Sequence, residues 1–221
     1  MKIIGFSVAS CFAYTLVTAG TLIDLSAEAS RPAANDMLRA TVFSESTGAN
    51  PAELARRVNA DVGEALKVIR STRNISVKSG QQSTYPVYSQ AQKIESWRMR
   101  SELILESKDT AATSELLGKL QQMRLAVGQV SMLPSPETRR QVEDEAMRDA
   151  IRAFQSRAAV VADQLGKAWH IKQLSIQQSG GMPVPLMRAR GGMMAAEAMA
   201  PLEAGESQVS TTVSGQIELA D

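Results

Sequence analysis

One long run of helical periodicity constrains this chain more than any other feature. Ser135-Pro136-Glu137 is a cap residue followed by proline at the first helical position, where its missing N–H removes no hydrogen bond. Apolar residues then recur at spacings of three and four as far as Gly166: Val142, Ala146, Ala150, Phe154, Ala158, Val161 and Leu165. Such a helix has about 30 residues and is about 45 Å long. Because its apolar face is mostly alanine, we expect it to pack closely on a sheet.

Strands are predicted around this helix, and in the first of them, from Ile23, apolar and polar residues alternate strictly. The segments are 23–30, 37–46, 93–106, 125–133, 169–177 and 209–219, with a short one at 75–77. Residues 31–36 are predicted to form a turn, so the first two strands are expected to be neighbours. Residues 80–92 are predicted to form a polar loop. Two more helices are predicted, from Asn50-Pro51 to about Arg70 and after Asp109. The fold class is therefore α+β, with antiparallel strands and three helices.

The first 19 residues have the pattern of a secretory signal peptide. Met1-Lys2 is a basic start, residues 3–16 are apolar or small, and Val17-Thr18-Ala19 fits the cleavage rule. Cleavage after Ala29 would remove a strand, so we predict a signal peptide at 1–19 and one folded domain at 20–221. The alternative is a chain anchored in the membrane by an uncleaved signal, and no later segment is expected to span a bilayer.

Composition excludes several classes of protein. One Cys and one His in 221 residues cannot supply a Cys/His zinc site, a disulfide framework or a Cys/His nucleophile pair. The 24 Lys and Arg against 23 Asp and Glu give no cationic field for nucleic acid. His170 is interpreted as an ordinary strand histidine, and Glu143-Asp144-Glu145 as a solvated helix face. No serine-nucleophile or phosphate-loop motif is present, so we predict no enzyme, no catalytic residues and no cofactor.

Residues 179–206 form a predicted loop rich in Gly, Pro, Ala and Met. It holds five of the eleven methionines, and these are the weak candidates for metal ligands: Met182, Met187, Met193, Met194 and Met199. Thioether sulfur suits Cu(I), and exposed methionine can also absorb oxidant as the sulfoxide. A third interpretation is a loop that covers an apolar surface or a subunit contact. No metal site is predicted from this segment.

The strand at 93–106 has two different faces. Arg98, Arg100 and Glu102 lie on one face, opposite the face that carries Trp97. An RNA platform would need aromatic residues on the same face as the basic ones. We therefore interpret the charged stripe as a solvated sheet face or a subunit interface.

Four features follow one another along residues 21–219. They are the alternating strand from Leu22 with the turn at 32–36 and the strand through Val42; Tyr85-Pro86-Val87-Tyr88 followed by the Trp97-led strand; the alanine-spaced helix to Leu165-Gly166; and a Pro/Met/Ala-rich stretch before Val209-Ser210-Thr211-Thr212-Val213. In this order they resemble the SIMPL-domain family. These are bacterial periplasmic proteins associated with oxidative-stress defence, known in some pathogens as a periplasmic immunogenic protein.

The resemblance implies a secreted protein of the Gram-negative periplasm that acts in envelope or oxidative-stress defence through assembly and protein interaction. It also implies a homo-oligomer and an unknown envelope protein partner, and it transfers no catalytic residue to this sequence. The competing hypothesis is a small ligand-binding or methionine-based redox-buffering module centred on 182–199.

Overall fold

The computed structural model describes residues 20–178 and 204–220. In chain order their elements are β1 (Thr21–Ala34), β2 (Met37–Gly48), α1 (Pro51–Ser71), β3 (Ser76–Tyr88), β4 (Ile94–Ser107), α2 (Thr110–Gln122), β5 (Ala126–Leu133), α3 (Pro136–Leu165), β6 (Trp169–Gln178) and β7 (Glu206–Leu219). Every strand pairing among these residues is antiparallel. The predicted α+β class, with three helices and the longest in the second half of the chain, is confirmed.

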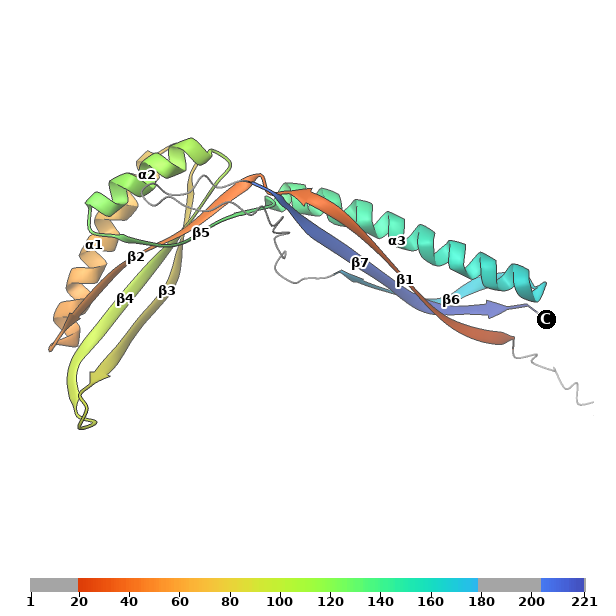
Figure 1. Ribbon diagram of the computed structural model, residues 1–221, viewed down its shortest axis with the longest axis horizontal. Coiled ribbons are helices and arrows are strands. Elements are labelled where there is room, and N and C mark those ends of the chain that lie inside the picture. Colours follow the sequence, from red (N-terminus) through yellow and green to blue (C-terminus); the bar gives the residue numbers. More distant parts are fainter. Residues whose placement is uncertain (1–19, 179–203, 221) are drawn as a thin grey trace, which may run out of the picture.

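The strands form two sheets, which lie in different lobes of an elongated molecule (Figure 1). The four-stranded sheet has the order β3-β4-β2-β5 and is covered by α1 and α2. The three-stranded sheet has the order β1-β7-β6 and is covered by α3. In sequence, the four-stranded lobe is inserted between β1 and α3. The chain therefore crosses between the lobes at Asn35-Asp36 and again at Pro134-Ser135.

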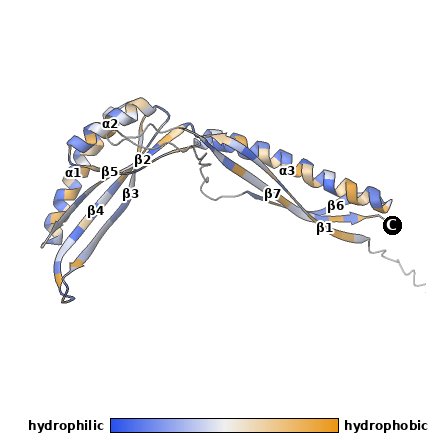
Figure 2. Ribbon diagram, viewed as in Figure 1, coloured by the Kyte–Doolittle hydropathy of each residue, from blue (hydrophilic) through white to orange (hydrophobic). Residues whose placement is uncertain are grey.

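The core of the four-stranded lobe follows from the alternation in β2 and β4. Val42 lies opposite Leu103 and Ala40 lies opposite Leu105, and all four side chains are buried on the helix side. Aliphatic residues of α1 and α2, such as Ile69, complete the same cluster. Figure 2 shows this alternation of hydrophobic and hydrophilic residues along the elements. The pattern therefore sets which sheet face is covered.

All three helices begin on the cap residues that the sequence predicts. The side chains of Asn50, Asp109 and Ser135 each accept a hydrogen bond from a backbone N–H two or three residues further on, at 2.9, 2.9 and 3.3 Å. Gly166 ends α3 with φ of 64°, a left-handed conformation that favours glycine. Local capping chemistry thus fixes where these helices begin and where α3 ends.

The long helix packs on its sheet through a stripe spaced by four residues. Five fully buried residues form it: Ala146, Ala150, Phe154, Ala158 and Ala162. At about 3.6 residues per turn, each step of four moves the stripe about 40° further round the helix. The stripe therefore winds around α3, which lets the helix follow the twisted ribbon of β1 and β7. Close packing of the alanine face on a sheet is confirmed.

Two expectations for the first strands are wrong. Residues 31–34 continue β1 instead of forming a turn, and only Asn35-Asp36 separates β1 from β2. The two strands do not pair, because β1 pairs along its whole length with β7, from Thr21 opposite Leu219 to Ala34 opposite Glu206. Pro32 is compatible with this strand because β1 is an edge strand, where proline is tolerated.

The expected polar loop at 80–92 is also wrong for most of its length. β3 runs to Tyr88, and the connection to β4 is only Ser89 to Lys93, closed by a 2.9 Å hydrogen bond from Ser89 N–H to the Lys93 carbonyl. β3 is polar because it is an edge strand with exposed residues on both faces, and its pairing with β4 is irregular between Ser79 and Gln82. Polar composition therefore concealed a strand.

Two predicted segments lie outside the described residues. These are the signal peptide at 1–19 and, up to residue 203, the loop at 179–206; β7 begins at Glu206. Within 20–178 and 204–220, no helix is both long and apolar enough to cross a membrane. The single domain at 20–221 stays a prediction.

Candidate functional site

In the described part of the chain, the edge strand β6 carries aliphatic side chains that α3 leaves partly exposed. Its pairing with β7 places Ile171, Leu174 and Ile176 on the helix side, opposite Ile217, Gly215 and Val213. Their exposed fractions are nevertheless 37%, 37% and 40%. Of the β6 residues, Trp169 alone packs against the α3 core. The helix side of β6 therefore presents an aliphatic strip beside α3.

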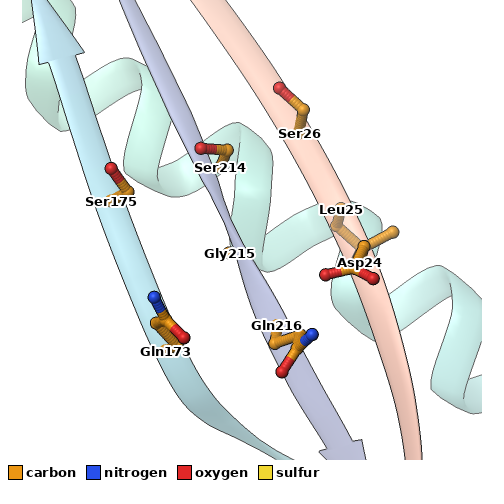
Figure 3. A pocket seen from close by; sticks show the side chains of 8 residues that line it. All are labelled: Asp24, Leu25, Ser26, Gln173, Ser175, Ser214, Gly215 and Gln216. Carbon is orange, nitrogen blue, oxygen red and sulfur yellow. The ribbon is translucent and has the colours of Figure 1, made fainter.

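The other face of the same sheet is polar and slightly hollow (Figure 3). Its depression of about 520 Å³ lies across all three strands. Register brings Ser26, Ser214 and Ser175 into one row, and Asp24, Gln216 and Gln173 into the next. The lining offers hydroxyl and amide hydrogen-bonding groups with one carboxylate. Such a surface can bind polar groups, but it lacks the paired titratable groups that acid/base chemistry uses.

Gly215 allows β6 to approach β7 at this depression. A Cβ atom on Gly215 would overlap the backbone carbonyl oxygen of Gln173. The overlap occurs where the β6–β7 register shifts, between Ile171 and Gln173. A residue with a side chain at 215 would therefore push β6 away from the sheet.

The predicted charged stripe lies on the face of the four-stranded sheet opposite its helices. Arg98, Arg100 and Glu102 alternate along β4 with buried Met99 and Leu103, as predicted. The stripe is internally paired: Arg100 lies 2.8 Å from Glu102, and Glu45 lies 3.7 Å from Arg98 and 3.8 Å from Arg100. These contacts balance much of its charge within the face.

The aromatic residues that belong to this charged face come from neighbouring strands. The guanidinium carbon of Arg100 lies 3.4 Å from the centroid of the Phe43 ring. Tyr85 stands opposite Arg98 in the β3–β4 register and is exposed. Trp97 lies on the helix side, as predicted, and packs with Met99. Sequence reasoning missed Phe43 and Tyr85 because only the register of three strands brings them beside the arginines.

The second cluster of polar groups lies at the crossings between the lobes. Asp36 accepts hydrogen bonds from the Ser135 N–H at 2.6 Å and from the hydroxyls of Ser135 and Thr138, each at 2.9 Å. Lys108 lies 3.3 Å from the same carboxylate and 2.8 Å from Glu137. Burial would raise the pKa of Asp36, but the hydrogen bonds outweigh it and lower the pKa to about 2. The cluster is a structural connection held by a charged carboxylate.

The remaining titratable candidates are engaged in surface pairs. His170 Nε2 lies 3.4 Å from Glu218, and the same carboxylate lies 3.3 Å from Lys172. Of the acidic run in α3, Glu143 pairs with Arg139 at 2.7 Å and Glu145 lies 3.3 Å from Arg31. These positions agree with the interpretation of a strand histidine and a solvated helix face.

The metal hypothesis rests on residues that the structure does not describe. All five candidate methionines, 182, 187, 193, 194 and 199, lie between Gln178 and Ala204. In the described part of the chain, no three His, Cys, Asp or Glu side chains gather into a group that could hold a metal ion. The candidates therefore stay predictions.

Comparison with protein families supplies the remaining evidence. The family model SIMPL, described as a protein of unknown function (DUF541), matches residues 23–217. No curated protein matches this chain. The matched range runs from β1 to β7 and so includes both lobes. The chain belongs to the SIMPL family.

Proposed function

We propose that this chain acts without catalysis in the periplasm, in envelope or oxidative-stress defence, by assembling with copies of itself and binding an envelope protein. The signal-like residues 1–19 support the compartment, which the resemblance to the SIMPL family also implies. The stress role is what the resemblance to the SIMPL family implies. The observation that carries the assembly part is that, among residues 20–178 and 204–220, no strand pairs with the outer edge of β6.

An edge strand with an aliphatic strip is a typical site of protein association. Among the described residues, β6 pairs with β7 alone, so its other edge offers backbone N–H and C=O groups. Ile171, Leu174 and Ile176 add apolar area, whose removal from water contributes about 25 cal/mol per Å². A partner strand at this edge would satisfy the backbone groups and cover the strip together.

The first experiment measures the absolute mass of the exported protein in solution by light scattering behind a sizing column. We expect a discrete multiple of the chain mass, and we expect Leu174→Asp to reduce it. The matched control is Val160→Asp, because Val160 is an aliphatic residue of the same lobe, 60% exposed on α3. A monomeric wild type, or equal loss in both variants, would contradict assembly through β6.

The stress role needs a measurement in cells. A strain lacking this protein should survive hydrogen peroxide less well than its parent, and the wild-type gene should restore survival. If assembly serves this role, Leu174→Asp should fail to restore survival and Val160→Asp should succeed. Full survival of the deleted strain would contradict the stress proposal and leave the assembly measurement standing.

A methionine-based redox function is the second candidate, favoured by the five methionines between residues 182 and 199. Replacing all five by leucine keeps apolar side chains but removes the oxidisable sulfur. Loss of peroxide protection with unchanged mass in solution would favour this function. Unchanged protection would exclude it.

A further inference from the structure

We propose that β6 pairs antiparallel with β6 of a second copy, across a two-fold axis at Ser175. This inference rests on the proposed assembly function and adds the partner and the register. The pairing would join the sheets of two copies into one continuous sheet, with the aliphatic strips of both β6 strands on the same side.

The first argument is a comparison of the four sheet edges in the described part of the chain. Native edges are protected by charges, proline, irregular pairing or short length. β1 carries Asp24, Glu28 and Pro32, and β3 carries Lys78 with irregular pairing to β4. The register of β5 with β2 shifts between Ala40 and Val42. Each of these three edges has a recognisable obstacle to a further strand.

In β6, the charged Lys172 and the shift of the β6–β7 register lie before residue 173, and residues 173–178 carry neither feature. Their sequence, Gln-Leu-Ser-Ile-Gln-Gln, contains no charge, no proline and no glycine. Its register with β7 is regular from Gln173 to Gln178. Two copies brought together here would oppose no like charges, because all six side chains are neutral. This edge is therefore compatible with a copy of itself.

The second argument fixes the register. Residues directly opposite in an antiparallel pair share a face of the sheet. Leu174 and Ile176 lie on the helix side, whereas Gln173, Ser175 and Gln177 lie on the polar face. An axis at Ser175 places Leu174 opposite the partner's Ile176, and does so twice because of the symmetry. It also places Gln173 opposite the partner's Gln177.

The neighbouring registers that keep the faces matched are poorer. An axis at Leu174 places Ile176 opposite the partner's Lys172, which sets an aliphatic side chain against an ammonium group. An axis at Ile176 places Leu174 opposite the partner's Gln178 and leaves one aliphatic pair, Ile176 with the partner's Ile176. The axis at Ser175 alone gives two aliphatic pairs between residues 173 and 178.

The polar face supports the same register. Ser26, Ser214 and Ser175 already form one row across the sheet (Figure 3). An axis at Ser175 would set this hydroxyl opposite the partner's Ser175 and continue the row into the second copy. The sheet contains a precedent, because the hydroxyls of Ser30 and Ser210 lie 2.6 Å apart on neighbouring strands. Cross-strand serine pairs of this kind stabilise a sheet modestly.

The test is cross-linking of single-cysteine variants of the full chain in a Cys11→Ser background. Ser175→Cys should give a covalent dimer on mild oxidation. A short bis-maleimide should give the same dimer where the geometry of the two cysteines disfavours a disulfide. Gln173→Cys and Gln177→Cys are the matched controls. Each should cross-link weakly alone, whereas a mixture of the two should give a heterodimer, because these positions face each other across the axis.

The outcomes separate this inference from the proposed function. Self-cross-linking of Gln177→Cys above that of Ser175→Cys would overturn the register. In another outcome, no variant cross-links, but the wild type is an oligomer that Leu174→Asp dissociates. That result would overturn pairing with a second β6 and would still support assembly through this face. A monomeric wild type would overturn both. A Ser175→Cys dimer that is abolished by Leu174→Asp would support the inference.

Discussion

The backbone N–H of Ser135 donates a 2.6 Å hydrogen bond to the carboxylate of Asp36, although the two residues are 99 positions apart. Asp36 lies at the first crossing between the lobes and Ser135 at the second. The hydroxyl of Ser135 also donates to Asp36, at 2.9 Å, while it caps α3. One carboxylate therefore links both connections and the start of the longest helix.

Asp36→Asn is expected to destabilise the chain in a pH-dependent way. The folded pKa of Asp36 is about 2, below its ordinary value of 3.8. The Asp36 carboxylate therefore contributes about 2 kcal/mol to the free energy of unfolding. This contribution is present above about pH 4 and is lost as the pH falls towards 2. Urea unfolding at pH 7 and at pH 2.5 should show a large difference between wild type and variant only at pH 7. An equal difference at both pH values would contradict a role for the charge.

Phe154→Ala is expected to lower the free energy of unfolding by about 3–5 kcal/mol, because it leaves a cavity in a close-packed core. Phe154 is the largest fully buried side chain of the α3 stripe. Val160→Ala in the same helix should change stability by less than about 0.5 kcal/mol, since Val160 is exposed. Denaturant unfolding of both variants measures this. Similar values for the two would show that α3 does not depend on its buried stripe.

Gly215→Val should separate β6 from β7, because the added side chain would overlap the Gln173 carbonyl. The expected cost is about 1–3 kcal/mol, as for other overpacked positions. Hydrogen exchange should show faster exchange of β6 amides, with β2 and β4 unchanged. Gly63→Ala is the control, because nothing lies within 4 Å of a Cβ at this helical position, and it should stabilise α1 by about 0.5–1 kcal/mol. Unchanged exchange of β6 in Gly215→Val would refute the close approach.

Glu106→Gln should lower the free energy of unfolding more than the loss of an exposed ion pair does. The Glu106 side chain is only 10% exposed and lies 2.6 Å from Arg39 and 3.0 Å from Lys78. Burial opposes its ionisation, but these two cations lower its pKa. We expect a loss of about 1.5–3 kcal/mol at pH 7, typical of hydrogen bonds to charged groups. The control Glu115→Gln removes an ion pair with Lys119 in which both side chains are exposed, so it should lower stability much less in the same thermal unfolding assay.

The helices and most strands could be predicted because their signals are local. The cap at Ser135, the stop at Gly166 and the stripe from Ala146 to Ala162 act within a few residues of each other. The pairing of β1 with β7 could not be predicted in this way, because Thr21 and Leu219 find each other only in the folded sheet. β3 was hidden by the polar residues that an exposed edge strand allows.

The sequence predicts the strand that carries the proposed assembly surface, but not the exposure of its aliphatic side chains. The segment from Trp169 to Gln177 is predicted as a strand, and its apolar residues, which alternate with polar ones except at Lys172-Gln173, would be expected on a buried face. The sequence does not reveal that α3 covers β1 and β7 but leaves Leu174 and Ile176 exposed. That difference arises from the path of one helix across three strands. Phe43 and Tyr85 were missed for a similar reason, since their neighbours are set by register.

The pairing of β1 with β7 also sets an order of events during synthesis. The strands β2 to β5 can pair as soon as residues 37–133 have left the ribosome, since all their partners lie within that span. β1 leaves first but has no partner strand until residues 206–219 follow. Until then β1 is an unpaired strand that follows residues 1–19 of the nascent chain. A factor that holds the emerging chain would therefore have its longest opportunity to bind at residues 21–34.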